Sequence, residues 1–528
     1  QHADIDIPES DLTSVVLSRV DELGDKAALI DGPTGRSLSY LQLREQVNRL
    51  AAGLHRRGFR KGDVFAIFIP NVPEYAVVFL GVAAIGGVNT TVNSLYSCAD
   101  LIHQFNDSGA RFLLTIPDFL DRALPAAEAC GIEEIFVLGE AEGITPFSEL
   151  LDNDGHAPVV EIDPKADLVA LPYSSGTTGL SKGVMLTHEN LISNMVLSCQ
   201  SNPIDESDSA IGVLPFFHIY GMVLILNLSV YRGATLVTIP RFELEQFLQL
   251  VQDYKITNLN LVPPLVLAMA NHPSVDNYDL SSVRMIGSGA APLGEKLEQA
   301  CASRLNCRVY QGYGLTEAAP VVTSTLSVAP AEDGAGPVPA QPDPGSVGTA
   351  LPGIEIRLVD DHGHTPLQGD PGQVSIRGAN LFSGYWPDGD DAPDEDGWWA
   401  TGDVGFLAPD GQLFLVDRVK ELVIVSGFSV YPTEIEDVVA EVPGVREVAV
   451  IGVPDDDTGE AVVAYVVAPD QDPETVEAAV RARCVVRLAR FKQPRRIEVV
   501  DALPHTVTGK VRKGSLRAAE RRRHLELL

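Results

Sequence analysis

The sequence predicts an α/β protein with a large N-terminal part and a smaller α+β part at its C-terminus. Amphipathic stretches such as YLQLREQVNRLAAGLHRRG alternate with short apolar runs such as VFAIFI from about Leu38 to Thr115, and a similar alternation continues to about Leu280. This rhythm is typical of helices that cover a mostly parallel sheet. From about Lys420 the pattern changes to a strand and turn, the helix PTEIEDVVAEV, the strands EVAVIGV and EAVVAYVVA, a second helix and a basic tail. We expect this last segment to form a compact domain of about a hundred residues.

Several apolar runs of the large part end in turn-forming residues. The segments ATLVTI, ITNLNLV and VRMIGSGAA are interpreted as strands that end in Gly, Pro or Ser. Open α/β sheets bind their ligands beyond the carboxyl ends of such strands. We therefore expect ligand-binding residues in these turns.

A third pattern lies between the two parts. Residues 329–345, APAEDGAGPVPAQPDPG, are rich in Pro, Ala and Gly and lack a periodic apolar face, which predicts a flexible loop. The runs GIEIRLV, GQVSIRG and GQLFLV follow, separated by Gly and Asp turns. They predict a small antiparallel or mixed β unit.

Composition excludes several classes of partner. The chain has 528 residues, of which 45 % are hydrophobic, as in an ordinary globular enzyme with at least two domains. Its formal net charge of -33 repels phosphate backbones and anionic lipid. We expect no nucleic-acid partner, and the sequence leaves the oligomeric state open.

The spacing of the cysteines and two uncharged windows bear on the cellular compartment and on a possible membrane span. The six cysteines are scattered without metal-ligand spacing, and the first residues lack the basic and apolar runs of a signal peptide, so we expect a cytoplasmic protein with reduced thiols. Two windows without charge, Tyr75–Ala99 and Ser209–Tyr231, are long enough to raise the question of a membrane helix. Gly, Asn, Pro and His interrupt them, which favours buried elements over a membrane span.

The strongest single motif is SSGTTGLSKG, which begins at Ser174 and follows the strand-like run LVALPY. Its glycines allow close backbone approach, its hydroxyls and N–H groups can donate to oxygens, and Lys182 supplies positive charge. Such a loop can wrap a phosphate, although the spacing is not that of a Walker loop. The alternative is an ordinary flexible surface loop.

A second motif, QGYGLTE, places an aromatic ring, a hydroxyl and a carboxylate on one turn after CRVY. Tyr313 can stack on a base, Thr316 can donate to a phosphate oxygen, and Glu317 can hold Mg²⁺, which favours carboxylate and phosphate oxygens. A turn with a capping Thr explains the same residues.

Weaker signals come from four other segments. WATGD and DRVK supply Asp403 and Arg418, which suit ribose hydroxyls and phosphate; a helix N-cap and a surface ion pair are the alternatives. PHTVTGKVR places Lys510 after a glycine on a turn, where a solvated basic tail is the alternative. His218 in PFFHIYG either lines a pocket or is a core group, and its spacing favours the core.

Together these segments resemble the adenylate-forming superfamily, which contains acyl-CoA synthetases, 4-coumarate-CoA ligases, firefly luciferase and the adenylation domains of peptide synthetases. The resemblance covers nearly the whole chain. It rests on SSGTTGLSKGVMLTH, PFFHIYG, SGAAPLG, QGYGLTE, TGD, DRVKE, SGFSVYPTEIE and the terminal TGK, all in family order. It implies a carboxylic acid-CoA ligase that uses ATP, Mg²⁺ and coenzyme A and forms acyl-AMP and pyrophosphate, then acyl-CoA and AMP.

The resemblance also implies a domain organisation. An N-terminal AMP-binding domain, residues 1–417, would contain two α/β subdomains and the small β unit. Residues 418–420 would form a hinge centred on Lys420, and residues 421–528 a mobile α+β lid.

Residue roles follow from the same resemblance. Catalytic roles fall on Lys510, which would reach the carboxylate and the α-phosphate, and on His218, Thr316 and Glu317, the last as the magnesium ligand. ATP or coenzyme A would contact Ser174, Ser175, Gly176, Thr177, Thr178, Gly179, Lys182, Gly289, Ala290, Ala291, Gln311, Gly312, Tyr313, Gly314, Asp403, Arg418, Lys420, Ser426, Gly427 and Phe428. The acid would be lined by His218, Tyr220, Gly287, Gly312, Pro320 and Val321.

The acid itself is less determined. The strand after the hinge, LVIVSGFSVYP, lacks the lysines and glutamine of plant coumarate ligases and resembles bacterial fatty-acyl ligases. Gly287 and Gly289 are expected to leave room in the acyl tunnel. A cinnamate- or coumarate-type acid and a medium- to long-chain fatty acid both fit; alternatives are an acyl-AMP ligase that serves a carrier protein and luciferase-like oxidation of the adenylate.

Overall fold

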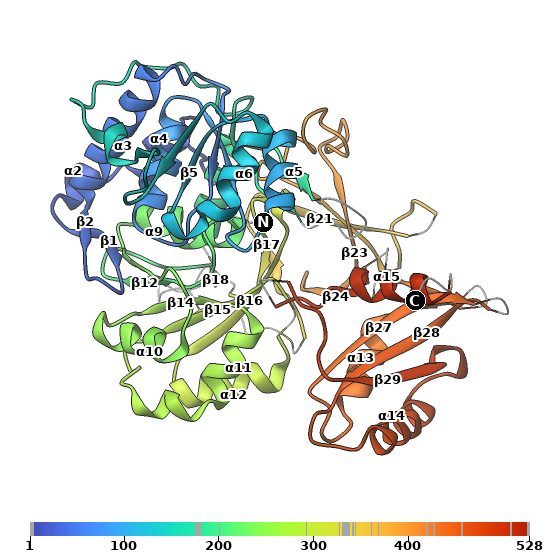
Figure 1. Ribbon diagram of the computed structural model, residues 1–528. Coiled ribbons are helices and arrows are strands. Elements are labelled where there is room, and N and C mark those ends of the chain that lie inside the picture. Colours follow the sequence, from blue (N-terminus) through green and yellow to red (C-terminus); the bar gives the residue numbers. More distant parts are fainter. Residues whose placement is uncertain are drawn as a thin grey trace. The chain divides into compact units, whose positions relative to one another are not determined.

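The computed structural model describes residues 5–174, 181–199, 201–291, 293–326, 328–329, 338–339, 343, 345–360, 362–367, 369–418, 421–425, 428–455, 458–506 and 509–524. These residues fall into two compact units. The larger holds the chain through Glu355 together with Arg377–Trp399, and the smaller holds Ile356–Ile376 and the chain from Ala400. Figure 1 shows the elements of each unit.

A seven-stranded sheet forms the first layer of the larger unit. Its order is β11 (Leu186–Thr187), β8 (Leu168–Ala170), β4 (Val88–Thr91), β3 (Val64–Ile67), β5 (Ala110–Thr115), β6 (Glu134–Val137) and β7 (Thr145–Pro146). The pairs from β8 to β7 are parallel, and only β11 runs antiparallel to β8. This confirms the mostly parallel sheet that the alternating pattern predicts.

A nine-stranded sheet forms the second layer. Its order is β2 (Ser37–Ser39), β1 (Ala27–Asp31), β13 (Thr235–Thr238), β12 (Ser209–Gly212), β14 (Asn258–Leu261), β15 (Met285–Ser288), β16 (Arg308–Gly314), β17 (Val321–Ser324) and β20 (Thr349–Ala350). The five pairs from β1 to β16 are parallel, so the carboxyl ends of β14, β15 and β16 reach the same edge.

Helices cover the faces of these sheets. They are α1 (Leu12–Val16), α2 (Val20–Leu23), α3 (Tyr40–Arg56), α4 (Glu74–Ala84), α5 (Cys98–Ser108), α6 (Leu120–Cys130), α7 (Ser148–Leu151), α8 (His188–Ser198), α9 (Leu228–Tyr231), α10 (Leu244–Asp253), α11 (Pro263–Asn271) and α12 (Glu295–Leu305). Helix α3 begins at a capping box of Ser39 and Gln42. Helices α10, α11 and α12 lie along one side of the nine-stranded sheet (Figure 1).

Most of the two charge-free windows lies in buried elements. The first contains most of α4, whose residues from Glu74 to Ala83 are all buried. The second contains β12, the π-helix Gly221–Asn227 and α9. Within the described ranges, no helix combines the length and hydropathy needed to cross a bilayer.

The smaller unit begins with the small β unit. Four strands pair in the order β21 (Glu355–Val359), β22 (Gly372–Arg377), β23 (Trp399–Leu407) and β24 (Leu413–Arg418). Of the preceding segment 329–345, the described residues include Ala329, which pairs with Val338 in the short hairpin of β18 (Val328–Ala329) and β19 (Val338–Pro339). The other residues of the predicted loop lie largely outside the described part.

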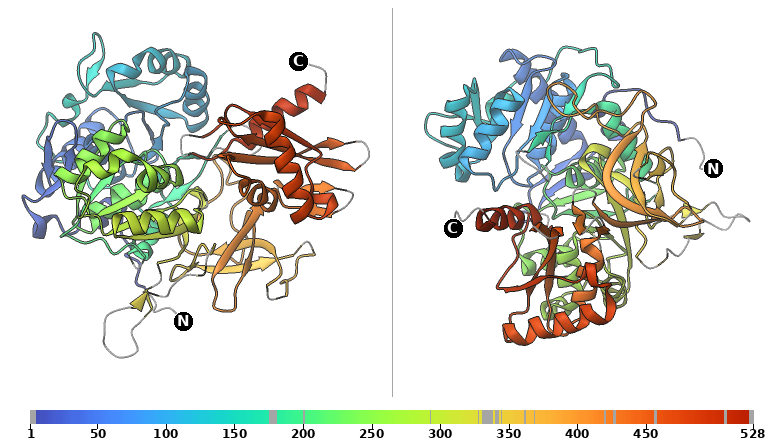
Figure 2. Two further views of the ribbon diagram at one scale, coloured as in Figure 1. Left: turned by 90° about the horizontal axis from the view of Figure 1, so that it is seen from below. Right: turned by 90° about the vertical axis from the view of Figure 1, so that its right-hand side faces the viewer.

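The C-terminal residues form a five-stranded sheet between helices. The sheet contains β25 (Val423–Val425), β26 (Phe428–Val430), β27 (Glu447–Asp455), β28 (Gly459–Val467) and β29 (Arg496–Val500), and the helices are α13 (Pro432–Ala440), α14 (Pro473–Arg487) and α15 (Lys513–His524). Successive residues of β28 point to opposite faces: Val462 packs in the cluster with α13 and α14, and Val463 packs in the cluster that includes Leu516 of α15. Figure 2 shows these helices on opposite sides of the strands.

Candidate functional site

The carboxyl ends of β15 and β16 bring two of the sequence motifs together. The parallel register sets Gly287 beside Tyr310 and Ser288 beside Gln311. Gly289, Ala290 and Ala291 follow β15 directly. The motifs SGAAPLG and QGYGLTE therefore meet at the sheet edge, where strand ends predict a ligand site.

The buried side chain of Gln311 stabilises this edge of the sheet. Its side-chain oxygen accepts the Leu293 N–H at 3.0 Å, and its amide nitrogen donates to Glu298 Oε2 at 2.7 Å. The side chain, expected to contact a cofactor, thus fixes the loop after β15 to helix α12. Ala290 in that loop has a φ of 70°, which is uncommon for a residue other than glycine.

Gly312, Tyr313 and Gly314 lie in β16. Tyr313 is buried, with 8 % of the residue exposed. A Cβ on Gly312 would approach Thr323 O to 3.2 Å, and one on Gly314 would meet Pro320 O at 2.1 Å. Gly314 is therefore required by the close approach of the following turn, and a side chain at Gly312 would be crowded by the next strand.

The turn that carries Thr316 and Glu317 is held by buried amides. Ala318 O accepts from Asn194 Nδ2 at 3.1 Å and from Asn380 Nδ2 at 2.6 Å. Asn194 Oδ1 also accepts the Val321 N–H at 3.2 Å. These contacts fix the turn from helix α8 and from the segment after β22.

Glu317 is a buried carboxylate, 8 % exposed. Its Oε1 accepts the Tyr385 hydroxyl at 2.7 Å, and its backbone oxygen accepts the Phe382 N–H at 2.9 Å. A carboxylate fixed through one oxygen keeps the other for a cation. Mg²⁺ commonly takes one or two carboxylates together with phosphate oxygens and water. The single carboxylate of Glu317, held through one oxygen, therefore fits a magnesium ion that shares its ligands with a nucleotide. Among the described residues, no group of three or more His, Cys, Asp or Glu side chains is arranged to hold a metal.

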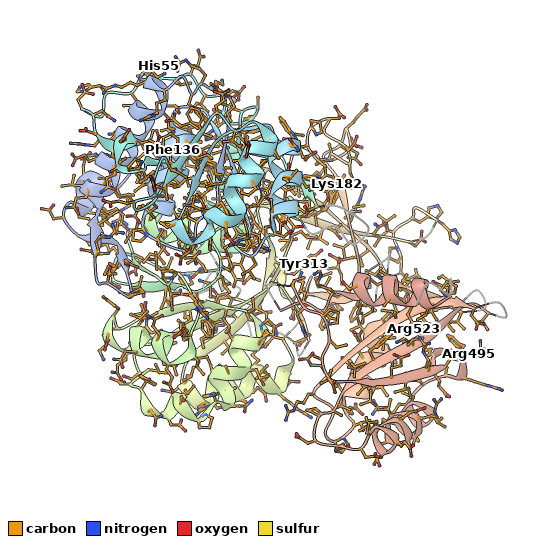
Figure 3. All side chains as sticks on the ribbon, in the orientation of Figure 1. His55, Phe136, Lys182, Tyr313, Arg495 and Arg523 are labelled. Carbon is orange, nitrogen blue, oxygen red and sulfur yellow. The ribbon has the colours of Figure 1, made fainter. Side chains whose placement is uncertain are left out.

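The phosphate-type loop is described at its two ends only. Ser174 in β9 (Tyr173–Ser174) pairs with Lys182 in β10 (Lys182–Gly183). Ser175, Gly176, Thr177, Thr178 and Gly179 lie outside the described residues. Lys182 is exposed, and its ammonium lies 5.1 Å from the centre of the Tyr385 ring. Figure 3 shows Lys182 and Tyr313 within the larger unit.

His218 lies in a half-buried loop rather than in the core that its spacing favours. Its Nδ1 accepts the Tyr220 N–H at 3.3 Å. Asn71 holds the loop, since its amide donates to Gly212 O at 2.9 Å and to Leu214 O at 2.8 Å while its oxygen accepts from Phe216 N.

Tyr220 faces the strand that carries Gly287. Its hydroxyl lies 3.3 Å from Gly287 O and 3.4 Å from Asn260 Oδ1, and burial raises the pKa of Tyr220 well above its usual range. A Cβ on Gly287 would lie 2.6 Å from the Tyr310 hydroxyl, and one on Gly289 would lie 3.1 Å from Tyr220 Cε1. The expectation of free space beside Gly287 is wrong, because Tyr310 fills it.

Pro320 and Val321 follow Glu317 in the sequence and are bonded to the same turn and to helix α8. Pro320 is buried and its oxygen accepts the Leu315 N–H at 2.9 Å; Val321 is half-buried and its oxygen accepts from Asn194 Nδ2 at 2.7 Å. Both therefore lie next to the Thr316–Glu317 turn.

In the smaller unit, Asp403 lies in β23 and is 5 % exposed. The antiparallel register sets Arg418 of β24 opposite it. The alternative of a helix N-cap for Asp403 is wrong, because the residue lies within a strand. Asp403 N donates to Thr401 Oγ1 at 3.1 Å, which fixes the TGD segment of this strand.

Lys510 is exposed on a short turn of the smaller unit. The Lys510 N–H donates to Thr506 Oγ1 at 3.1 Å, and Lys510 O accepts the Thr506 N–H at 2.7 Å. Behind the turn, Lys513 pairs with Glu436 at 2.8 Å and with Glu421 at 3.2 Å. The backbone of the turn is thus fixed, and Lys510 itself is exposed.

The expected coenzyme A segment is described in part. Lys420, Ser426 and Gly427 lie outside the described residues. Phe428 begins β26, which pairs with β25 through the partners Val425 and Phe428.

Sequence reasoning missed the polar residues that support the site. Asn71, Asn194, Asn260, Asn380 and Tyr385 lie in different segments, and none belongs to a phosphate-type motif. For Asn71 a signal existed: it directly follows the apolar run VFAIFIP, at the end of a predicted strand.

Comparison with known proteins finds relatives over nearly the whole chain. The family model described as AMP-binding enzyme matches residues 17–386, and the model described as AMP-binding enzyme C-terminal domain matches residues 434–510. The chain is 36 % identical to a 4-coumarate–CoA ligase 2 of Petroselinum crispum over 526 residues, which is 98 % of this chain and 95 % of the relative.

Solved structures are similar over the same extent. An anthranilate CoA ligase, AuaEII, in complex with anthranoyl-AMP aligns with a TM-score of 0.87 at 26 % identity, covering 97 % of this chain and 98 % of that one. ATP-bound MatB from Rhodopseudomonas palustris aligns with a TM-score of 0.84 at 30 % identity, covering 97 % and 99 %. A fatty acyl CoA synthetase of Mycobacterium tuberculosis aligns with a TM-score of 0.75 at 29 % identity, covering 96 % and 98 %. The chain belongs to the AMP-binding enzyme family.

Proposed function

We propose that this AMP-binding enzyme is an acid–CoA ligase that converts a carboxylic acid and ATP to acyl-AMP and pyrophosphate, and then transfers the acyl group to coenzyme A. The observation that carries the proposal is the meeting of the Thr316–Glu317 turn and Lys182 at Tyr385. Glu317, a carboxylate suited to magnesium, and Lys182, a cation suited to phosphate, both contact Tyr385. Full-length similarity to acid–CoA ligases agrees with it.

The first step needs neutralisation of negative charge more than covalent chemistry. The acid's carboxylate attacks the α-phosphorus in line and pyrophosphate leaves. We assign Lys182 and the loop before it to the pyrophosphate side, Thr316 to a phosphate oxygen, and Arg418 and Lys510 to the α-phosphate region. Mg²⁺, held by Glu317, would neutralise phosphate charge when bound.

We assign the roles in nucleotide recognition residue by residue. Gly289 to Ala291 would form the wall of the adenine site, Tyr313 would stack on the base, and Asp403 would accept hydrogen bonds from the ribose hydroxyls. The burial of Asp403 supports this assignment, since a fixed carboxylate is a good acceptor for a pair of hydroxyls.

The second step requires that Lys510 give way to coenzyme A. We assign residues 418–420 to the hinge and 421–528 to a lid that turns about Lys420. Ser426, Gly427 and Phe428 would then guide the thiol to the adenylate. Rotation of a domain about a few residues between strands is a common closure mechanism.

We further propose that the acid is an aryl-propenoic acid of the cinnamate or coumarate type. The hydroxyl of Tyr220 and the amide of Asn260 lie beside Gly287 O in the region assigned to the acid. A polar aryl acid can exchange hydrogen bonds with this hydroxyl, whereas an alkyl chain cannot, and the similarity to 4-coumarate–CoA ligases favours the same class. A medium- to long-chain fatty acid is the second candidate, favoured by the similarity to a fatty acyl CoA synthetase.

We place the reaction in the cytoplasm. All six cysteines are free in the structure, which suits a reducing compartment. The proposed substrates ATP and coenzyme A are also abundant there.

The test is ATP-dependent pyrophosphate release with 4-coumaric, cinnamic, octanoic and palmitic acids, each with and without coenzyme A, and with products identified by mass. We expect acyl-CoA from the aryl acids. Tyr220→Phe, which removes one hydroxyl, should lower kcat/KM for 4-coumaric acid more than for octanoic acid. Preference for the alkyl acids would reject the aryl assignment, and acyl-AMP that accumulates despite coenzyme A would reject the ligase.

A further inference from the structure

We propose that Tyr385 is a positioning residue for the adenylation step, which orients the Glu317 carboxylate toward magnesium and holds Lys182 beside the phosphate site. The inference rests on the proposed function, because it takes Glu317 as the magnesium ligand. It adds a residue from a segment that lies outside all the motifs used to identify the site.

The hydroxyl of Tyr385 makes the first contact. It donates to Glu317 Oε1 at 2.7 Å across 68 residues of sequence. A hydrogen bond to one carboxylate oxygen fixes the rotation of the group and leaves the second oxygen directed elsewhere. Groups that orient a metal ligand in this way typically contribute about 10- to 100-fold in metal affinity or activity.

The ring of Tyr385 makes the second contact. The ammonium of Lys182 lies 5.1 Å from the ring centre, within the range of a cation–π interaction. Within the described part of the chain, Lys182 forms no ion pair with a carboxylate. The ring therefore holds the lysine without neutralising its charge.

The backbone around Tyr385 joins the same two elements. Trp386 N donates to Gly183 O at 2.9 Å, and Met185 N donates to Gly384 O at 3.1 Å, so this segment pairs with the end of the phosphate-type loop. Phe382 N donates to Glu317 O at 2.9 Å. Residues 382–386 thus fix both the lysine and the carboxylate to one support.

A purely structural role of the ring is the competing explanation. Tyr385 packs against Phe382 with ring centres 5.1 Å apart, and Phe382 packs against Trp399 at the same spacing. Tyr385→Phe separates the two roles, because it keeps the ring and its packing but removes the donor to Glu317. Tyr385→Leu removes both the donor and the ring.

The experiment measures the Tm of the full chain with ATP over a series of Mg²⁺ concentrations, without acid or coenzyme A. We expect Tyr385→Phe to raise the half-saturating Mg²⁺ concentration about 10-fold while the Tm without ligand stays near that of the native chain. Tyr385→Leu should also weaken the Tm shift by ATP in the absence of Mg²⁺, because Lys182 loses its support. Tyr40→Phe is the control, since it removes a buried tyrosine hydroxyl that donates to Ala234 O at 2.6 Å.

Glu317→Gln separates failure of the inference from failure of the proposed function. If Glu317→Gln shifts the Mg²⁺ dependence and Tyr385→Phe behaves like Tyr40→Phe, the positioning role of Tyr385 is rejected while the magnesium site stands. If Glu317→Gln leaves the Mg²⁺ dependence unchanged, the magnesium assignment is rejected, and the inference with it.

Discussion

Gly287→Ala tests the packing at the expected acid site. The added Cβ would lie 2.6 Å from the Tyr310 hydroxyl oxygen, 2.7 Å from its Cζ and 3.0 Å from Asn260 Oδ1. Tyr310 is only 8 % exposed, so its ring cannot swing into solvent. Such overpacking costs about 1 to 3 kcal/mol.

Two other glycines give a graded control in the same unit. Gly289→Ala would approach Tyr220 Cε1 to 3.1 Å, a milder contact, and Gly294→Ala meets nothing within 4 Å. Gly294 is the N-cap of α12 with a φ of -68°, which alanine adopts without strain, so its replacement costs only the lost N-cap preference of glycine, about 0.5 to 1 kcal/mol. We therefore expect a larger loss of stability for Gly287→Ala than for either Gly289→Ala or Gly294→Ala.

Thermal unfolding and steady-state kinetics together check this prediction. Gly287→Ala should lower Tm by a few degrees relative to Gly294→Ala. It should also raise the KM for the acid more than that for ATP, because displaced Tyr310 and Asn260 disturb the wall beside Tyr220. Equal Tm values for the Gly287→Ala and Gly294→Ala chains would show that Tyr310 does not fill this space, and the packing argument would fail.

Three further predictions concern separate features. Lys510→Ala should reduce pyrophosphate release on the order of 10² to 10³-fold and spare thioester formation from supplied acyl-AMP; equal loss of both steps in a quenched-flow assay would contradict its assignment. Burial lowers the pKa of His188 from 6.5 to about 4. Between pH 6.5 and pH 4 the unfolded chain therefore binds more protons than the folded chain, and the free energy of unfolding falls by up to about 3 kcal/mol as the pH is lowered from 7 toward 4. His188→Gln should flatten that part of a denaturation series, and an unchanged slope would refute the cause. Lys513→Met should destabilise the smaller unit by about 3 kcal/mol, because it leaves Glu421 and Glu436 without their cation; the side chains of Lys513, Glu421 and Glu436 are only 12 %, 17 % and 18 % exposed. Hydrogen exchange should show the loss of stability in this unit. The control Arg481→Met breaks an exposed i,i+4 ion pair and should have little effect.

Local patterns predicted most of the fold. The runs ATLVTI, ITNLNLV and VRMIGSGAA contain β13, β14 and β15, and PTEIEDVVAEV contains α13. These elements are read correctly because a buried parallel strand needs a short continuous apolar run, and an amphipathic helix needs a 3.6-residue period. Asp403 was harder, because an acidic residue after a Thr and a Gly fits an N-cap as well as a strand.

The supports of the site could not be predicted in the same way. Asn194 holds Ala318 across 124 residues, Asn71 holds Gly212 across 141, and Tyr385 holds Glu317 across 68. The sequence does not distinguish a buried asparagine or tyrosine from an exposed one, and only the folded structure shows which residue it bonds to. The prediction of free space beside Gly287 fails for the same reason. A glycine in the sequence indicates that another group approaches closely, but it does not show that this group is Tyr310.

The charge of the chain makes the manner of holding Lys182 important. Acidic residues outnumber basic ones 72 to 39, and an ATP site needs cations that remain available to phosphate. A lysine paired with a carboxylate offers a phosphate little net attraction, because the carboxylate repels the same phosphate. Lys182 instead lies over an aromatic ring, which orients the ammonium through its quadrupole and adds no net negative charge. An acidic chain can in this way keep a cation in place for a nucleotide, and the replacement of Tyr385 by an acidic residue would be expected to weaken ATP binding more than its replacement by leucine.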